Sequence, residues 1–155
     1  MSQERFLPVI RALAKCYQAF ESHSSKHIRM LGLTSPQFDI IATLGNTSGM
    51  TCGELGELTL ITKGTLTGVL DRLEAKQLLI REHSQEDGRS WKVCLTPEGQ
   101  KLFEQIFPDH LNYLRPLFKD FTDTDMELIC QQLSRLEAAF TPDTATSSKA
   151  SKESR

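Results

Sequence analysis

The chain has 155 residues and a formal net charge of −2; 39% of its residues are hydrophobic and 25% are charged. This length suits one domain with a sizeable core and is too short for two ordinary ones, and the composition excludes an intrinsically disordered protein. No apolar run approaches the roughly 20 residues that a membrane helix needs, and the first residues lack the apolar core of a signal peptide. We therefore expect a cytoplasmic protein with no membrane contact.

The N-terminal residues 4–31 are predicted to form one long helix. Apolar side chains recur at helical spacing from Phe6 to Phe20 and become sparse after that. A helix of this length spans roughly 38 Å, which exceeds the needs of a small core. We therefore expect part of it to pack on another chain, and we expect Gly32 to end it.

A connecting helix is predicted within residues 35–48. Ser35 can cap its first turn, and Pro36 follows at a position where a missing N–H costs nothing. Phe38 and Ile41 would lie on its buried side, because three residues separate neighbours on one helix face.

Residues 51–73 have the pattern of a helix-turn-helix. Thr51 with Glu54 three residues later is a capping box that opens a short helix, and Thr62 can cap a second helix. The apolar face of the second helix would hold Leu66, Val69, Leu70 and Leu73. The opposite face carries small, polar or basic residues, namely Lys63, Thr65, Thr67, Gly68 and Arg72. The second helix of such a pair can enter the major groove of DNA.

The next segment predicts a two-stranded ribbon. Residues 78–82 and 91–95 have strand patterns, and residues 84–90 form a polar turn that contains a glycine. Residues 50–51 are expected to add a short strand. A ribbon directly after a recognition helix is a wing, and Arg89 at its tip can reach a narrow minor groove. The alternative is that the same helices and hairpin pack together in another kind of small domain.

The bulk charge argues mildly against DNA binding. Between Thr51 and Val93 the chain has six basic and seven acidic residues, a net charge of −1. Attraction for DNA would therefore depend on where the basic groups point and on helix N-termini, not on the total charge.

Residues 97–140 predict two further helices. Thr96 with Pro97 opens the first, which Pro108 or Pro116 could bend, and Thr122 opens the second. In the last helix, apolar residues recur at steps of three and four, at Met126, Ile129, Leu133, Leu136 and Phe140. This stripe is typical of a helix seam between two chains, or of ordinary core within one. Residues 141–155 are expected to be disordered.

The fold class that follows is mostly α with a small β-wing. A winged helix-turn-helix over residues 51–96 would be embedded in a helical dimerisation domain made of residues 4–31 and 97–140. Two-fold symmetry would then present two recognition helices to successive major grooves, about 34 Å apart.

Three segments make the chain resemble the MarR family of bacterial transcription regulators over about residues 5–140. They are LTSPQFDIIATL at 33–44, GTLTGVLDRLEAKQLLIRE at 64–82 and SQEDGRSWKVCLTPEGQKL at 84–102. The resemblance implies an obligate homodimer that binds a palindromic operator in double-stranded DNA, usually as a repressor. Release from DNA would follow binding of a small molecule or oxidation of a cysteine.

The resemblance also implies which residues contact DNA. The expected contacts are Thr62, Lys63, Gly64, Thr65, Thr67, Gly68 and Arg72 on the helix, with Asp87 and Arg89 on the wing. Asp71 and Asp87 match acidic positions that brace the wing arginine, and a carboxylate does fix the direction of a guanidinium. Relatives often have a large polar or basic residue at the position of Gly68, so base reading there could be reduced.

The candidate sensors are less well defined. Recognition helix and wing look similar to the peroxide-sensing OhrR-type branch, but Cys16 lies about six residues from that branch's cysteine position, where this chain has Ile10. Cys16 is either a redox sensor or an inert thiol. Of the other cysteines, Cys94 and Cys130 are expected to pack, and Cys52 is more simply a small residue in the first turn of its helix.

Two further sensing modes concern the first helix. His23 and His27 have metal-ligand spacing, but no third ligand is evident, so no metal site and no cofactor are predicted. A small phenolic or other organic effector could bind in a crevice between the dimer helices and the winged segment. The residues that could line it are Tyr17, His27, Met30 and Phe38.

These observations predict a dimeric, sequence-specific DNA-binding regulator, released by a small molecule or an oxidant, and not an enzyme. Nothing in the sequence supplies a catalytic set around Cys16 or a phosphate-binding loop. The alternatives are a winged-helix protein-interaction module and a thiol-based redox protein that does not bind an operator.

Overall fold

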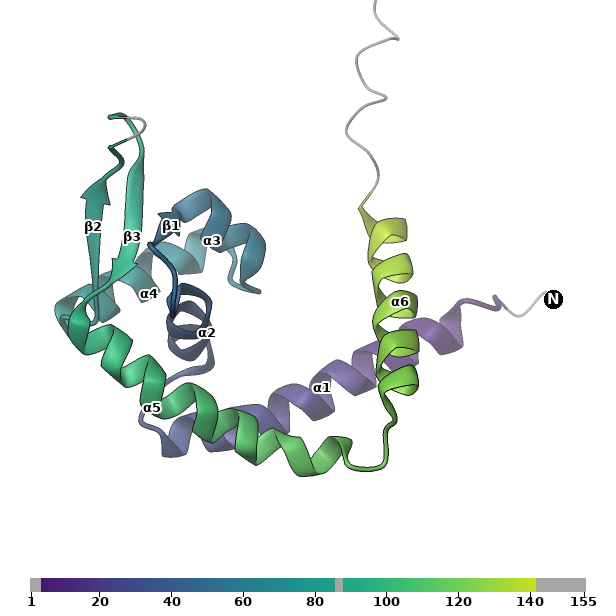
Figure 1. The fold of residues 1–155 in the computed structure, drawn as a ribbon. Coiled ribbons are helices and arrows are strands. Elements are labelled where there is room, and N and C mark those ends of the chain that lie inside the picture. The colour runs from purple at the N-terminus through teal and green to yellow at the C-terminus, as the bar shows by residue number, and fades with distance from the viewer. Residues whose placement is uncertain (1–3, 86–87, 142–155) are drawn as a thin grey trace, which may run out of the picture. The chain divides into compact units, whose positions relative to one another are not determined.

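A computed structural model describes residues 4–85 and 88–141, which divide into two compact units, one up to Leu114 and one from Arg115 onward. The first unit contains α1 (Leu7–Met30), α2 (Ser35–Leu44), β1 (Met50–Thr51), α3 (Cys52–Leu58), α4 (Lys63–Ala75), β2 (Leu79–His83), β3 (Trp91–Leu95) and α5 (Pro97–Leu114). The second contains the 3₁₀ turn η1 (Arg115–Phe118) and α6 (Asp123–Phe140). Figure 1 shows these elements. The predicted fold class, mostly α with a small β-wing, is confirmed.

Helix α1 is unbroken through the stretch where its apolar residues become sparse. Its C-terminal half packs against α2 and α5 and buries Ser24, His27 and Ile28. Two of these three side chains are polar, which is why the apolar pattern fades while the helix continues. Gly32, at φ +81°, follows the helix in the left-handed region that favours glycine.

The core of the first unit is built around α2. Ile40, Ile41 and Leu44 are at most 1% exposed. The cap of α2 is Thr34 and not Ser35, because Thr34 accepts a hydrogen bond from the Gln37 N–H and the Gln37 side chain accepts one from the Thr34 N–H. This capping box begins the helix one residue earlier than the proline pattern alone indicates.

The helix-turn-helix and the wing form as predicted. Thr51 and Glu54 make the capping box of α3, with the Thr51 N–H donating to Glu54 at 2.8 Å. The three strands form an antiparallel sheet in the order β1-β3-β2, with Met50 opposite Val93 and Ile80 opposite Cys94. In Figure 1, β2 and β3 extend as a ribbon beyond the helices that precede them.

Helix α5 begins where the wing returns to the core. The Thr96 hydroxyl accepts from the Gly99 N–H and donates to the Gln77 carbonyl, which fixes the first turn of the helix. A β-carbon at Gly99 would overlap the Leu78 carbonyl, so this contact requires glycine. Pro108 lies inside α5, whereas Pro116 lies in η1 beyond its end.

The second unit consists of η1 and α6. The capping box between Thr122 and Asp125 opens α6, as predicted. Every residue of α6 is at least partly exposed in the single chain, including the apolar stripe that contains Leu133 (49%) and Phe140 (61%). Among residues 4–85 and 88–141, no helix combines the length and the apolar character needed to cross a membrane.

Candidate DNA-binding surface and effector cavity

Helix α4 has two chemically distinct faces. Leu66, Val69, Leu70 and Leu73 are buried in the core. The residues expected to contact DNA from this helix lie on the other face: Thr62, Lys63, Gly64, Thr65, Thr67 and Arg72 are exposed, and Gly68 is half-buried. The sequence pattern therefore identified both faces, because burial at helical spacing leaves the intervening residues outside.

The N-terminus of α4 carries no negative charge. Its first turn has no acidic residue, and the Thr62 hydroxyl donates to Thr65 Oγ1 at 3.2 Å and does not cap the backbone N–H groups. The free N–H groups and the helix dipole favour an anion at this end. A β-carbon added at Gly64 or Gly68 would meet open space, so packing does not explain either glycine.

The wing places Arg89 at its tip, where the residue is exposed. The ribbon closes behind it through a hydrogen bond from the Ser84 N–H to the Ser90 carbonyl (2.8 Å). The rings of His83 and Trp91 are in contact across the ribbon, with centroids 3.9 Å apart and planes tilted by 35°. Asp87, the predicted wing contact and brace, lies outside the described residues.

Asp71 does not have the partner that the resemblance implied. Arg81 on β2 donates to Asp71 Oδ1 at 2.7 Å and to Glu74 Oε2 at 2.9 Å, so Asp71 braces the base of the wing through Arg81 and not Arg89 at the tip. The reason is local: β2 runs back along α4, and residues 71 and 74 share one helix face. The hydrogen bond to Asp71 also raises the pKa of Arg81.

A cleft of about 400 Å³ lies between α1, α2 and α5, next to the turn before α4. Tyr17 and Phe38, two of the four predicted lining residues, do line it. Met30 does not: it is 81% exposed at the end of α1, and Ile28 on the opposite face of that helix takes its place. His27 lies behind the wall, against His110.

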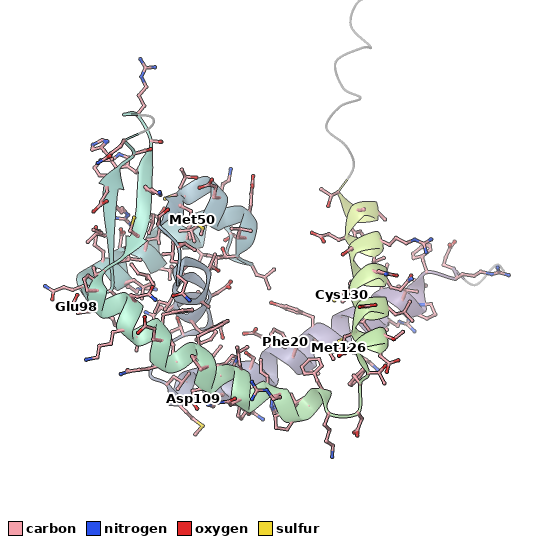
Figure 2. The ribbon with its side chains drawn as sticks, viewed as in Figure 1. Phe20, Met50, Glu98, Asp109, Met126 and Cys130 are labelled. Carbon is pink, nitrogen blue, oxygen red and sulfur yellow. The ribbon has the colours of Figure 1, made fainter. Side chains whose placement is uncertain are left out.

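A buried polar cluster joins α1 to α5 beside this cleft. His27 Nδ1 lies 3.0 Å from His110 Nδ1, and Ser24 Oγ lies 3.0 Å from His110 Nε2. Tyr113 stacks on His27 with ring centroids 4.3 Å apart, and Asp109 Oδ2 is 3.7 Å from His27 Nε2. Figure 2 shows Asp109 on α5 and Phe20 on α1, two side chains of this region.

Sequence reasoning missed several polar residues of the cleft, and His110 and Asp39 are the two with the most consequence for its chemistry. His110 follows Ile106 by four residues on the apolar stripe of α5, and a polar residue at that position was a usable signal. Asp39 stands between two buried residues of α2 and gave no signal, because its role depends on the distant Leu60.

All four cysteines are free thiols. Cys16 and Cys52 are exposed, and so is Cys130, which was expected to pack; it lies on α6, where no side chain is buried in the single chain (Figure 2). Cys94 is half-buried and donates to the Ser48 carbonyl at 3.4 Å. Burial, followed by the charge of Glu82, raises the pKa of the Cys94 thiol, which disfavours the reactive thiolate.

His23 and His27, the pair at metal-ligand spacing, both stack on Tyr113. Among the residues that the structure describes, no three His, Cys, Asp or Glu side chains are grouped so that they could hold a metal ion.

Comparison with known proteins identifies the family. The model of the MarR family matches residues 31–90. The HTH-type transcriptional regulator MhqR of Bacillus subtilis is 29% identical over 133 residues, which span 86% of this chain and 92% of MhqR.

Two solved structures share the fold. Sco3205 of Streptomyces coelicolor, a MarR family regulator in complex with DNA, superposes with a TM-score of 0.80 at 20% identity and 94% coverage of each chain. BpsR of Bordetella bronchiseptica, whose DNA binding is regulated by 6-hydroxynicotinic acid, gives 0.74 at 25% identity, over 88% of this chain and 98% of that one. None of these relatives points to the OhrR-type branch in particular. Together with the winged helix-turn-helix, these matches show that the chain belongs to the MarR family of DNA-binding transcription regulators.

Proposed function

We propose that this regulator is a homodimer that binds a palindromic operator through two copies of α4 and its wing. The observation that carries the proposal is the exposed, polar and basic first half of α4, which is followed directly by a ribbon with Arg89 at its tip. This order of elements matches a helix that enters the major groove and a wing that reaches the adjacent minor groove.

The near-neutral charge of the winged segment is compatible with this role. Asp71 and Glu74 are paired with Arg81, and Glu54 is held by the Thr51 N–H and hydroxyl. These pairings leave the net charge of the segment at −1, but they hold three of its seven acidic side chains in fixed positions by contacts within the protein. Lys63 and the N-terminus of α4 remain exposed on the face that would meet phosphate.

The terminal helices supply the surface for a second chain. Large apolar side chains outside the cleft are exposed on the first half of α1, on η1 with the turn that follows it, and on α6. They include Leu7, Ile10, Leu117, Phe118, Phe121, Ile129 and Leu133. A monomer rarely leaves so many large apolar groups in water, and pairing two copies would bury them.

We further infer that an organic effector in the cleft controls DNA binding, so that the protein acts in the cytoplasm as a ligand-released repressor. The cleft has a volume typical of small-molecule sites and a mainly apolar wall. The cleft borders the turn before α4, so a ligand bound there can affect the position of the recognition helix. Oxidation of the exposed Cys16 is the competing mode of release, and a Cys16→Ser variant that still responds to its signal would exclude it.

The DNA-binding proposal is tested by fluorescence anisotropy with duplexes drawn from the DNA upstream of the protein's own gene, across a series of salt concentrations. Arg89→Ala should weaken binding about 10- to 100-fold, because a guanidinium in a minor groove contributes about 1–3 kcal/mol. Lys26→Ala, which removes an exposed charge from α1, is the control and should bind like the wild type. Equal binding by both variants would remove the wing from the mechanism.

A further inference from the structure

We propose that the effector of the cleft is an uncharged or cationic aromatic compound that donates a hydrogen bond to Asp39, and that Asp39 positions the turn before the recognition helix. The ligand class rests on the cleft alone. The consequence for DNA binding rests on the proposed function.

The cleft carries acidic and no strongly basic side chains among the described residues that line it. Two carboxylates, Glu21 and Asp39, belong to its wall, and both are half-buried. Among the described residues that line the cleft there is no lysine or arginine, and the remaining wall is largely apolar or aromatic. A carboxylate ligand would therefore meet two like charges, whereas an amine or a phenol would meet two acceptors.

The histidine of the wall, His110, does not offer a cation to a ligand. Its Nε2 lies 3.0 Å from Ser24 Oγ and its Nδ1 lies 3.0 Å from His27 Nδ1, so both ring nitrogens already have partners. A bond between two Nδ1 atoms needs one donor and one acceptor, which excludes a fully protonated pair. Burial, followed by the nearby His27, lowers the pKa of His110, which favours its neutral form.

This charge pattern distinguishes the cleft from a site for aromatic acids. BpsR responds to 6-hydroxynicotinic acid, and an acid of this kind would find no lysine or arginine among the lining residues within 4–85 and 88–141. The selectivity expected here is therefore the reverse, with amines and phenols bound in preference to carboxylates of the same size.

Asp39 is bonded to the turn that precedes the recognition helix. The Leu60 N–H donates to Asp39 Oδ2 at 3.2 Å, and Leu60 lies in the turn between α3 and α4, two residues before Thr62. Leu60 and Ile61 themselves line the cleft. Burial raises the pKa of Asp39, and the Leu60 N–H opposes that rise, so the backbone bond helps to keep the carboxylate ionised.

A ligand that donates to Asp39 shares the carboxylate with the Leu60 N–H, because a carboxylate accepts several hydrogen bonds, and it draws negative charge away from the bond to Leu60. A ligand bound in the cleft would therefore weaken the hydrogen bond between Leu60 and Asp39. Because this bond holds the turn, the N-terminus of α4 would change its position. Asp39 is thus a positioning residue for DNA binding as well as the residue that selects the ligand. A coupling of this kind commonly changes affinity about 5- to 150-fold.

The ligand class is tested by calorimetry on the full chain without DNA, using three probes of matched ring size: benzylamine, 4-methylphenol and benzoate. The wild type should bind benzylamine and 4-methylphenol at least tenfold more tightly than benzoate. Asp39→Asn should lower the affinity for benzylamine at least tenfold and raise the affinity for benzoate. Glu57→Gln, which removes an exposed acid that does not line the cleft, should leave all three unchanged.

Three results would overturn the ligand assignment. They are benzoate binding as tightly as benzylamine, an unchanged order of affinities in Asp39→Asn, or no binding of any probe, as expected if a second copy of the chain fills the cleft. Since DNA is absent, failure here would leave the DNA-binding proposal untouched.

The positioning role is tested with Leu60→Pro, which removes the N–H donor and leaves the acid in place. The preceding Thr59 is extended (φ −104°, ψ 161°), as a residue before proline must be. This variant should bind operator DNA at least fivefold more weakly while it keeps the preference for benzylamine over benzoate. Asp39→Asn should still bind DNA, because its amide oxygen accepts from Leu60, but should need at least tenfold more 4-methylphenol for release. Unchanged DNA affinity in Leu60→Pro would refute the positioning role.

Discussion

The winged region and the C-terminal helix use their apolar side chains in opposite ways. Leu55, Leu70 and Leu73 of the helix-turn-helix are at most 1% exposed, so one chain completes their core. The stripe on α6 is just as regular in sequence, yet every residue of that helix is at least partly exposed in the single chain. Regular spacing therefore predicts that a helix has an apolar face. It does not predict which element packs against that face, because this depends on the tertiary and quaternary structure. For α6 we infer a second chain.

The largest expected effect comes from placing a charge in that stripe. Leu133→Asp should abolish the dimer and reduce operator binding at least 100-fold, because an unpaired buried carboxylate costs several kcal/mol and a palindrome needs both protomers. Sedimentation and anisotropy would measure both losses. Gln131→Asp, with the same new charge on another face of α6, should leave both intact. A DNA-competent dimer of Leu133→Asp would show that α6 is not the interface.

The same truncation made in the two regions sharpens the contrast. Leu70→Ala should lower the free energy of unfolding by about 2–5 kcal/mol, because Leu70 is 1% exposed and the lost side chain leaves a cavity. Leu128→Ala, at a site 54% exposed, should change it by less than about 0.5 kcal/mol. Urea unfolding of both variants measures the difference. Similar losses would mean that the dimer buries Leu128 as fully as the core buries Leu70.

A smaller effect is expected at the base of the wing. Arg81→Ala removes two ion pairs between β2 and α4 and should cost about 0.5–1.5 kcal/mol, since the partner carboxylates are 59% and 41% exposed and water weakens both pairs. Arg81→Lys should recover only part of the loss, because a lysine cannot hold both acids with the geometry of a guanidinium. Thermal unfolding would report both values. Full stability of Arg81→Ala would show that the core alone fixes the wing.

The smallest effect is a gain. Gly68→Ala should stabilise the protein by about 0.5–1 kcal/mol, because alanine favours a helix and the new β-carbon meets open space. Gly99→Ala is the contrasting variant and should destabilise, since its β-carbon would overlap the Leu78 carbonyl. The two melting temperatures should move in opposite directions, and a loss of stability in Gly68→Ala would contradict the packing described for α4.

Local chemistry explains why most of the fold was predictable from the sequence. The capping boxes at Thr51 and Thr122, the proline start of α5 and the alternation in β3 each act within a few residues. The shifted start of α2, at Thr34, has the same origin, because the two neighbouring residues Thr34 and Ser35 were both possible caps. Other boundaries differ as well: the connecting helix, predicted to residue 48, ends at Leu44, and the first helix, predicted at residues 4–31, is Leu7–Met30.

The site was less predictable because its contacts are long-range. The exposed face of α4 followed from the buried one, but the pairing of Asp71 with Arg81 depends on how β2 returns along the helix. The bonds from Leu60 to Asp39 and from His27 to His110 join residues 21 and 83 positions apart. The spacing of residues along the chain does not reveal such long-range contacts. The prediction that Met30 lines the cleft was wrong for this reason, because Met30 lies on the outer face of α1.

The most direct test of a regulator completed by a second chain is its mass in solution, measured by sedimentation velocity with and without operator DNA. The account predicts a species of twice the 17.5 kDa of one chain in the absence of DNA, and two protomers on each palindromic duplex. A 17.5 kDa species that still binds its operator with full affinity would contradict it.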